Sequence, residues 1–409
     1  MEGTSHIETH QRMRIAIVGA GAAGCFCAIE AKRRHPGSIV TVFESGPKPL
    51  AKVALTGGGK CNLCNTFEEI SDIRSVYPRG TRLMQNALRV FSPEDTIAWW
   101  QKEGVRLTIL EGGRVFPESM DAMQIVRALE NLMRRLEVEV RCRAKVLEVK
   151  ALEDGTFRIV TKEGETHADK VVITTGGGAL GLIAGLDIPT VRPVPSLFSF
   201  KITDGGLRAL QGSSAEGVSL KLSGSKFKSH GSVLLTDWGM SGPAVLKLSS
   251  YAARQLADNN WKGTLCVNWL SLDEDEVRDM LTNCAATFQK KMLSSTAPEG
   301  ISHRIWQHII SRAGLREDLR WAEMGSKGLN RLVSTLISDN YEIEGRSPFK
   351  DEFVTAGGVD LSAVKASSLE SKNYPGLFFA GEVLDIDGIT GGFNLQSAWS
   401  TGYIVASAI

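Results

Sequence analysis

The stretch from Arg14 to Glu44 constrains the fold more than any other part of the sequence. An apolar segment at 15–18 leads into the glycine-rich sequence VGAGAAG, then a helical stretch, then a second apolar segment at 39–43 that ends in Glu44. Strand, glycine turn, helix, strand and acid in this order are typical of a dinucleotide-binding βαβ unit, in which a pyrophosphate binds the N-terminus of the helix. The sequence therefore predicts a Rossmann-type α/β fold with a nucleotide site at this turn.

The three glycines of this turn have separate expected tasks. Gly19 allows a tight turn from strand to helix, Gly21 allows a pyrophosphate to approach bare backbone, and Gly24 allows the helix to pack closely on the strand. Glu44 follows at the end of the second strand, where a carboxylate accepts hydrogen bonds from both hydroxyls of an adenosine ribose. This contact needs a free 2′-hydroxyl, which indicates FAD or NAD rather than NADP. The alternative interpretation of the whole motif is a glycine-rich turn that binds no ligand.

Composition narrows the class of protein without identifying a partner. The 409 residues predict two or three domains, and the formal net charge of +1 gives no general attraction to nucleic acid or membranes. No apolar run reaches the roughly 18 residues of a membrane helix, and residues 1–12 lack the apolar stretch of a secretory signal. The seven cysteines are odd in number, which does not suit a disulfide framework. We expect a cytoplasmic protein whose residues 1–12 form a disordered tail.

Sequence periodicity predicts the elements that follow the βαβ unit. A helix is expected over 93–103, with Ser92 as its N-cap and Pro93 at its first position. A hairpin is expected over 105–117, and a second helix from Ser119 to about Leu136. Beyond this helix the apolar period changes to two, which predicts a meander of three strands at about 138–150, 156–162 and 166–174.

A middle stretch of different character interrupts the glycine-rich α/β pattern. From about residue 196 short strands and then helices are expected, and the glycine-rich pattern resumes near residue 348. No second GxGxxG follows a strand in this stretch, so a stable nicotinamide-binding domain is not expected there. We therefore expect the chain to leave the nucleotide-binding domain and to return to it.

Motifs along nearly the whole chain resemble those of one family of bacterial flavoproteins. They are VGAGAAG at 18–24, LTGGGKCN at 55–62, GGRVFPES at 112–119, LLTDWGMSGPAVL at 234–246, FVTAGGV at 353–359 and GLFFAGEVLDIDGITGGFNLQSAW at 376–399. On these motifs the chain resembles the BaiN-like NAD(P)/FAD-dependent oxidoreductases, also labelled aminoacetone oxidase family FAD-binding enzymes. The resemblance implies an FAD cofactor, with NAD(P)H as a transient electron donor.

The resemblance also implies the domain organisation. The expected fold class is α/β, with a glutathione-reductase-like FAD-binding Rossmann domain into which a β-barrel-like domain and a small helical domain are inserted. The expected boundaries are 1–12 for the tail, 13–195 for the first part of the FAD-binding domain, 196–271 for the β-rich insert, 272–347 for the helical insert and 348–409 for the second part of the FAD-binding domain.

Three departures from the usual family pattern concern the surroundings of the site. Only GGGALGLIAGLDIP separates Thr175 from Thr190, where the family usually carries a longer glycine-rich segment. Lys60 stands where arginine is usual, and it supplies a point charge instead of a bidentate fork. Asp237 replaces a frequent histidine, and Cys64 replaces a small hydroxyl residue. We expect these changes to affect the choice of substrate more than the choice of cofactor.

The resemblance places the ring system of FAD against two glycine-rich segments. Residues 57–62 would lie along the isoalloxazine ring, and residues 391–394 open the last helix, whose N–H groups would face the flavin N1–O2 edge. Glu382 would accept hydrogen bonds from the ribityl chain. The candidate cofactor-binding residues are Gly19, Gly21, Ala22, Ala23, Gly24, Glu44, Ser45, Lys52, Gly57, Gly58, Gly59, Lys60, Cys61, Asn62, Val146, Thr175, Gly176, Gly177, Gly381, Glu382, Gly391, Gly392, Phe393, Asn394 and Leu395.

Cys61 and Asn62 are the candidate catalytic residues. Asn62 offers donors and an acceptor, and Cys61 is an acid, a thiol nucleophile or a packing residue. Together with Cys64, Cys61 forms a CxxC sequence, whose alternative reading is a dithiol relay beside the flavin. No metal site is expected, because Cys142 has no paired cysteine nearby.

Charged and aromatic side chains outside these motifs have two readings each. Arg114 and the pair Asp385 and Asp387 contact substrate or phosphate, or are solvated loop charges. Tryptophans on helical segments are expected in the core or between domains, with a stacking platform as the alternative: Trp99, Trp100, Trp306 and Trp321. The helical insert is rich in cations that would suit an RNA backbone if they shared a face, but acids interleave with them; the cations are Arg304, Arg312, Arg316, Arg320, Lys327 and Arg331.

The leading functional expectation is an FAD-dependent oxidoreductase. NAD(P)H would reduce the flavin, and flavin N5 would deliver hydride to a carbonyl-conjugated double bond of an unidentified substrate. The resemblance links such chemistry to dehydro-bile-acid enones and to uridine in ribosomal RNA. The alternatives are a flavin-dependent amine oxidase that produces peroxide, and an RNA- or ribosome-associated flavoprotein such as a uridine reductase. A small-molecule substrate is expected, with RNA as the alternative partner; no membrane partner is expected, and monomer and homodimer both stay open.

Overall fold

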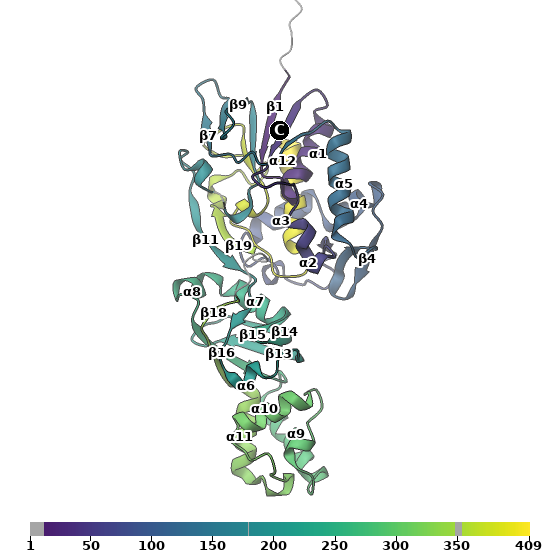
Figure 1. Ribbon diagram of the computed structural model, residues 1–409, viewed down its shortest axis with the longest axis vertical. Helices are drawn as coiled ribbons and strands as arrows, with labels where there is room; N and C mark the ends of the chain where they lie inside the picture. Colours follow the sequence, from purple (N-terminus) through teal and green to yellow (C-terminus); the bar gives the residue numbers. More distant parts are fainter. Residues whose placement is uncertain (1–11, 179, 348–353) are drawn as a thin grey trace, which may run out of the picture. The chain divides into compact units, whose positions relative to one another are not determined.

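Two compact units make up the chain. The computed structural model describes residues 12–178, 180–347 and 354–409, and it divides into one unit of residues 1–193 with 354–409 and a second unit of residues 194–353 (Figure 1). The first unit is therefore built from both ends of the sequence. The expected tail at 1–12 falls almost wholly outside the described residues, and so does the expected boundary at residue 348.

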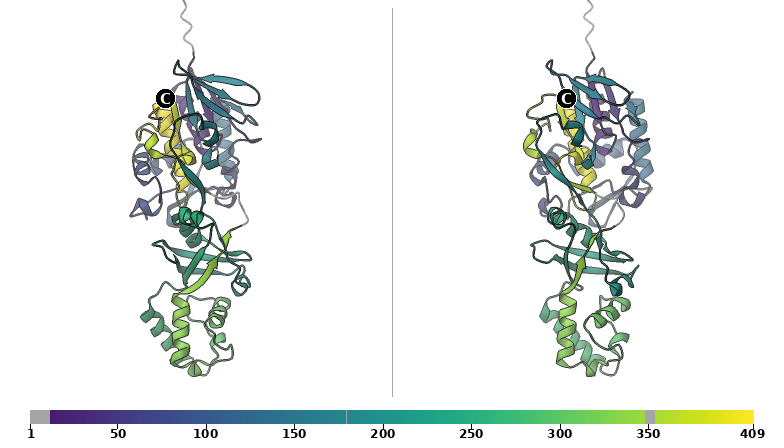
Figure 2. Two further views of the ribbon diagram at one scale, coloured as in Figure 1. Left: turned by 90° about the vertical axis from the view of Figure 1, so that its left-hand side faces the viewer. Right: turned by 60° about the vertical axis from the view of Figure 1, so that its left-hand side comes forward.

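A five-stranded parallel sheet forms the centre of the first unit. Its strand order is β20-β10-β1-β2-β6, and every neighbouring pair is parallel. The bounds are β1 Arg14–Val18, β2 Ile39–Phe43, β6 Glu139–Arg141, β10 Lys170–Ile173 and β20 Leu377–Phe379. Helix α1 (Ala22–Arg34) connects β1 to β2, and the last helix, α12 (Phe393–Ala408), lies beside it (Figure 2). This is the predicted βαβ unit within a Rossmann-type sheet.

The strands β7, β8 and β9 form an antiparallel meander, which is a sheet of its own and shares no strand with the parallel sheet. Its strands are β7 Glu148–Ala151, β8 Phe157–Val160 and β9 Glu165–Ala168. The predicted strands 138–150 and 166–174 were each wrong in extent, because each one divides between the parallel sheet and the meander. At the first division Arg143 has a φ of 57°, and its N–H bonds to the carbonyl of Gly46. At the second, Asp169 leaves the ladder to pair with Arg14 at 2.9 Å.

The remaining elements of the first unit include the predicted capped helix. Helix α4 begins at Pro93, and Ser92 and Asp95 form a capping box at its start. Trp99 and Trp100 are buried, as expected. The helices are α2 Thr56–Gly59, α3 Thr81–Val90, α4 Pro93–Lys102 and α5 Ala122–Arg135; the strands are β3 Cys64–Asn65, β4 Leu107–Leu110, β5 Arg114–Pro117 and β19 Val354–Val359, which pairs with β11 Thr190–Ser196.

A curled seven-stranded sheet organises the second unit. Its order is β17-β16-β13-β14-β15-β12-β18, so β17 and β18 lie at opposite edges although a single residue, Glu344, separates them in sequence. The two edges must approach each other at this point, which gives the sheet the barrel-like form that the resemblance implied. The strands are β12 Phe200–Lys201, β13 Ser214–Leu222, β14 Lys228–Thr236, β15 Gly239–Ser241, β16 Gly263–Asn268, β17 Asp339–Ile343 and β18 Gly345–Arg346.

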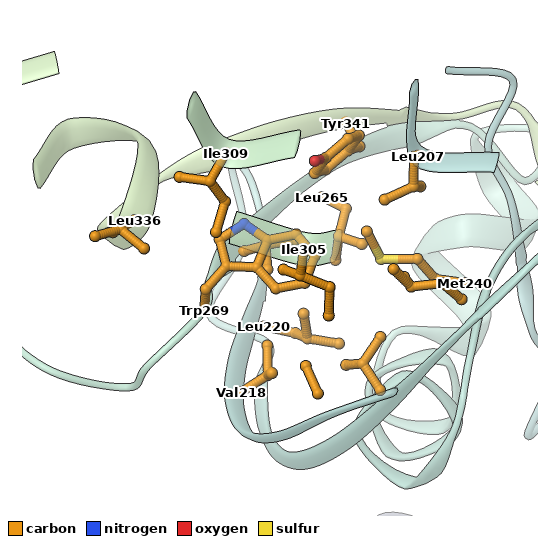
Figure 3. Packing of buried hydrophobic residues seen from close by; sticks show 14 of the residues in the cluster. Leu207, Val218, Leu220, Met240, Leu265, Trp269, Ile305, Ile309, Leu336 and Tyr341 are labelled. Atoms are coloured by element: carbon orange, nitrogen blue, oxygen red, sulfur yellow. The ribbon is translucent and has the colours of Figure 1, made fainter. Parts of the chain in front are cut away.

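One continuous core joins this sheet to the helices of the same unit. Figure 3 shows Leu220 and Leu265 from the strands packed with Ile305 and Ile309 from α10 around Trp269. Because this cluster spans the expected β-rich and helical inserts, their boundary at 271 stays a prediction. The helices are α6 Gly205–Arg208, α7 Pro243–Tyr251, α8 Ala253–Asp258, α9 Glu274–Thr287, α10 His303–Arg312 and α11 Gly325–Ile337.

A buried carboxylate ties the helices of this unit to its sheet. Asp339, 3% exposed on β17, accepts hydrogen bonds from Trp269 Nε1 at 3.0 Å and from Arg312 Nε at 2.9 Å. The Tyr341 hydroxyl also donates to Asp339, and His308 Nε2 lies 2.8 Å from that hydroxyl. Burial, and then the charge of Asp339, raise the pKa of Tyr341 far above its usual range, so the phenol stays protonated and donates.

Among the residues that the structure describes, no helix is both long enough and apolar enough to cross a bilayer.

We expect Asp339→Ala to lower the free energy of unfolding of the second unit by about 3–5 kcal/mol, because it leaves the Arg312 guanidinium and two buried donors without their shared acceptor. Urea denaturation combined with hydrogen exchange of α10 and β17 measures the effect. Glu342→Ala, an exposed position on the same strand, is the control and should change stability by less than about 0.5 kcal/mol. Equal losses of stability in the two variants would contradict the role of Asp339 in joining the helices to the sheet.

Candidate functional site

The β1–α1 turn separates the glycines that packing requires from the one that it does not. A Cβ at Gly24 would lie 2.0 Å from the carbonyl oxygen of Gly19, and a Cβ at Gly19 would lie 2.5 Å from that of Thr174. Around Gly21, in contrast, a Cβ would meet no atom within 4 Å. The protein's own packing therefore explains Gly19 and Gly24, whereas the open space at Gly21 fits the approach of a ligand.

The N-terminus of α1 offers backbone donors beside this space. The N-cap residue Gly21 has no side chain to cap the helix, and the first turn contains no acid. The first helical hydrogen bond runs from Cys25 N–H to Gly21 O at 3.0 Å. The N–H groups before Cys25 have no acceptor within the helix, and with the helix dipole they favour an anion such as a pyrophosphate.

Glu44 lies at this turn, as its position at the end of β2 predicted. Its Oε2 accepts a hydrogen bond from Ala20 N–H at 3.0 Å, and its Oε1 accepts one from Gly46 N–H at 2.7 Å and one from the Ser45 hydroxyl at 3.2 Å. Nearby, Ala144 N–H bonds to the Glu44 carbonyl, and the buried Val146 follows. The backbone thus holds the carboxylate at the turn, and its contact with a ribose stays a prediction.

The end of β10 adds an unsatisfied polar atom to the same region. Thr174 Oγ1 donates to the carbonyls of Val18 and Gly19, at 3.0 and 2.7 Å, which fixes the turn. The neighbouring Thr175 Oγ1 is buried and has no hydrogen-bond partner among the described residues. Buried hydroxyls are normally paired, so this one fits a polar ligand atom. Gly177 is explained by packing, because a Cβ there would meet Thr355 at 2.0 Å.

The carboxylate of Glu382 lies beside two other predicted cofactor-binding residues, Lys52 and Gly176. Its Oε1 accepts from Thr355 N–H at 2.8 Å, and its Oε2 lies 3.8 Å from Lys52 Nζ. A Cβ at Gly176 would lie 3.6 Å from the same Oε2. Gly381 has a φ of 75°, and a Cβ there would press on Ala23 of α1. Glu382, Lys52 and Gly176 are thus brought together, and the ribityl contact of Glu382 stays a prediction.

The two segments assigned to the flavin ring meet in the structure. With its amide oriented to satisfy both neighbours, Asn62 donates to Cys64 O and accepts from Gly392 N–H, each at 3.1 Å. A Cβ at Gly392 would lie 2.3 Å from Cys64 O, so the approach of the two segments requires glycine. A Cβ at Gly58 or Gly59 would meet nothing within 4 Å. Asn62 therefore links the segments, and it takes up the first N–H group at the N-terminus of α12.

The side chains of Phe393 and Asn394 support the loop before α12. Phe393 is buried, and its carbonyl accepts a hydrogen bond from the buried Tyr77 hydroxyl at 2.8 Å. Asn394 Oδ1 accepts from Gly388 N–H, and its Nδ2 donates to Gly388 O, both at 2.8 Å. Contacts from these two residues to FAD would consequently involve the backbone, whose N–H groups lie at the helix N-terminus.

A buried ion pair holds this loop to the segment before α3. Asp387 is fully buried, and Arg79, with 11% of its side chain exposed, donates to it from Nε to Oδ1 and from Nη2 to Oδ2. Of the two readings of the pair Asp385 and Asp387, that of a solvated loop charge was wrong for Asp387. Asp385 accepts from Gly357 N–H at 3.0 Å. No sequence pattern indicates the Arg79–Asp387 pair, because only the tertiary fold brings the two residues together.

The burial of the two CxxC cysteines bears on the roles proposed for them. Both Cys61 and Cys64 have 0% exposure, and all seven cysteines are free thiols. Burial raises the pKa of Cys61 to about 11, with a hydrogen bond from Thr56 acting in the opposite direction, and burial raises the pKa of Cys64 further. The thiolate is the reactive form, so the environment disfavours a dithiol relay and favours the packing role. Catalysis by Cys61 stays an untested prediction.

Outside this region the remaining candidates have ordinary surroundings. Arg114 is exposed, and its Nε donates to the Glu111 carbonyl. Asp237 is exposed, and its carbonyl accepts from Arg208. No group of three or more His, Cys, Asp or Glu side chains suited to a metal ion occurs among the described residues.

Comparison with known proteins gives consistent matches over the whole chain. The family described as HI0933-like protein Rossmann domain matches residues 13–408. The chain is 30% identical over 408 residues to a ribosomal RNA dihydrouridine synthase of Haemophilus influenzae, covering 96% of this chain and 97% of that protein. It is 29% identical to the protein of the same name in Escherichia coli, covering 97% and 98%. It is 27% identical to a 3-dehydro-bile acid delta(4,6)-reductase of Clostridium scindens, also covering 97% and 98%.

These matches confirm the expectations about fold class and cofactor. The Rossmann-type fold, the resemblance to BaiN-like flavoproteins, the FAD cofactor and the class of FAD-dependent oxidoreductase all stand. The assignment of individual residues to FAD rests on the geometry described above and stays a prediction.

A matched pair of glycine variants separates ligand contact from packing. We expect Gly21→Ala to fold with the stability of the unsubstituted apoprotein and to lose FAD affinity by about tenfold or more, since only the ligand occupies the space that its methyl group enters. Gly24→Ala, in contrast, should unfold the turn, because its Cβ collides with backbone. Flavin absorbance after gel filtration and thermal unfolding of the apoprotein measure both effects. Full FAD retention in Gly21→Ala would contradict the pyrophosphate site.

The Arg79–Asp387 pair predicts a local loss of stability. Asp387→Ala removes the buried carboxylate that pairs with the Arg79 guanidinium, which should cost about 3–5 kcal/mol. Hydrogen exchange of the segment 385–395 should accelerate accordingly. Glu118→Ala breaks a surface pair with Arg106, whose side chains are 60% and 88% exposed, and should cost at most about 1 kcal/mol. Unchanged exchange in Asp387→Ala would show that the pair does not hold the loop.

Proposed function

Because the chain belongs to the HI0933-like family and is an FAD-dependent oxidoreductase, we propose that it reduces a carbonyl-conjugated double bond with NAD(P)H as the electron donor. FAD, when bound, supplies the hydride chemistry of this reaction. The observation that carries the proposal is the agreement between relatives with different substrates. The name of each of the three relatives describes saturation of such a double bond, in uridine or in a dehydro-bile acid.

We infer that the substrate is a uracil base of ribosomal RNA. Two of the three relatives, at 30% and 29% identity over nearly the whole chain, carry the name of ribosomal RNA dihydrouridine synthase. The double bond of uracil is conjugated to a carbonyl, and dihydrouridine is its saturated product. A steroid dienone is the second candidate substrate, on the relative at 27% identity.

Each group of site residues receives a task in this proposal. The backbone at Gly21 and the first turn of α1 would bind the pyrophosphate, and Glu44 the adenosine ribose. Glu382, with Lys52 beside it, would bind the ribityl chain. The N-terminus of α12, Phe393–Leu395, would stabilise negative charge at the flavin edge through its N–H groups and dipole. Asn62 would position that helix end against the loop along the ring.

Two further observations support the proposed electron donor and the proposed compartment. No second GxGxxG follows a strand in the sequence, so NAD(P)H would bind transiently rather than in a domain of its own. Seven free thiols suit a reducing compartment, and we propose the cytoplasm.

Anaerobic half-reactions test the proposal. We expect the purified protein to show flavin absorbance, NADH or NADPH to bleach it, and a uridine-containing ribosomal RNA fragment to restore it with formation of dihydrouridine, measured by mass spectrometry of the nucleosides. A fragment whose uridines are already reduced is the control and should restore nothing. Absence of bleaching by either nicotinamide would sink the donor assignment. Recovery with air and an amine alone, with release of peroxide, would identify an amine oxidase instead.

A further inference from the structure

The β13–β14 hairpin of the second unit exposes an unusual set of lysines. Lys221 on β13 and Lys228 on β14 lie directly opposite each other in the antiparallel register, and both are exposed. Lys226 is exposed in the turn between these strands. Alternate residues of β13, such as Leu220 and Leu222, are buried in the core, so Lys221 lies on the solvent face of the sheet.

A fourth lysine lies at the same end of the sheet. The N–H of Ser223, in the hairpin turn, donates to the carbonyl of Thr264 on β16 at 2.9 Å. Lys262 comes two residues before Thr264 and is exposed. The start of β16 and the hairpin turn are therefore neighbours, and they gather four ammonium groups. We call Lys221, Lys226, Lys228 and Lys262 the lysine hairpin.

The protein's own interactions do not account for this arrangement. Opposed residues of antiparallel strands have Cβ atoms about 4.5–5.5 Å apart, and like charges at such positions destabilise the pairing. None of the four lysines forms an ion pair with a described residue. Some other cations of the unit have acidic partners: Arg312 pairs with Asp339, and Arg316 with Asp318. The unmatched positive charge of the lysine hairpin thus fits an external anion.

The surroundings of the lysine hairpin select the kind of anion. The neighbouring aromatic residues, Phe227 and Trp261, are partly buried against the core, and the Arg346 guanidinium lies over the Trp261 ring at 4.3 Å. Lysines supply point charges that bind phosphate without reading sequence. Farther along the strands, Ser271 bonds to His230, and the acidic first turn of α9 begins at Glu274. The positive surface therefore ends before α9 and suits a short run of phosphates.

We propose that the lysine hairpin binds the phosphate backbone of the RNA substrate, an inference that rests on the proposed function. The cations of α10 and the segment after it are less suitable, because acids pair with Arg312 and Arg316. A small substrate carries no phosphate chain, so the lysine hairpin contributes only to reactions with RNA.

Charge removal at the lysine hairpin tests this binding. The variant with Lys221, Lys226, Lys228 and Lys262 all changed to Gln should raise KM for the RNA fragment at least tenfold and leave kcat unchanged. Because each contact with a single-stranded phosphate contributes about 0.7 to the slope of log K against log salt, that slope should fall by up to about 3. NAD(P)H bleaching and reoxidation by a free dienone or uridine should not change. The four Lys→Arg changes should preserve RNA binding.

A control variant of equal charge completes the experiment. It carries four exposed lysines changed to Gln elsewhere, at Lys162, Lys290, Lys327 and Lys372, and should bind RNA nearly as the unsubstituted protein does. Equal effects of the two variants, or an unchanged salt slope in the first, would overturn the lysine hairpin while the RNA substrate stands. If the unsubstituted protein neither binds nor reduces RNA, the proposed substrate fails and the inference fails with it.

Discussion

The packing of the β1–α1 turn against the end of β10 is the contact on which the cofactor unit depends. Gly19 and Gly24 leave no room for a side chain, and the Thr174 hydroxyl bonds to two carbonyls of the turn. The turn is therefore rigid without any ligand, and its N–H groups are oriented in advance. A ligand that binds such a site pays little to order the protein, which favours tight retention of a large cofactor.

The last helix of the chain, α12, is also held in place by close packing and hydrogen bonds. Helix α12 packs closely on α1, as the limited space at Gly402 shows. A Cβ added there would lie only 3.0 Å from the carbonyl oxygen of Ala23. The N-terminus of α12 and the loop before it are fixed by contacts from two separate segments, through Asn62 on one and through Tyr77 and Arg79 on the other. Two helix N-termini from distant parts of the sequence thus become parts of one unit. The insertion between them does not interrupt the parallel sheet, because β10 and β20 still pair.

Sequence reasoning succeeded where a local pattern carries the information. The spacing of glycines and apolar residues predicted the βαβ unit, and Ser92 with Pro93 predicted the start of α4. It failed where the outcome depends on residues far apart in the chain. The period of two ran without a break from β6 into β7, so the division between sheets was invisible. Asp387 looked like a solvated loop acid until the fold placed Arg79 beside it, and the unpaired hydroxyl of Thr175 is a property of packing alone.

The two units carry different kinds of constraint, and this bears on how the family takes different substrates. In the first unit a single methyl group at Gly19 or Gly24 would collide with backbone, so the β1–α1 turn has little freedom to change. In the second unit strands such as β13 and β17 bury alternate side chains and leave the others on the solvent face, as with Leu220 and Lys221. Substitutions on that face leave the core intact. Relatives at 27–30% identity are named for substrates as unlike as RNA and a bile acid. In the proposed function the shared chemistry rests on the cofactor-binding residues of the first unit, and a difference in substrate is most easily accommodated on exposed faces such as that of the lysine hairpin.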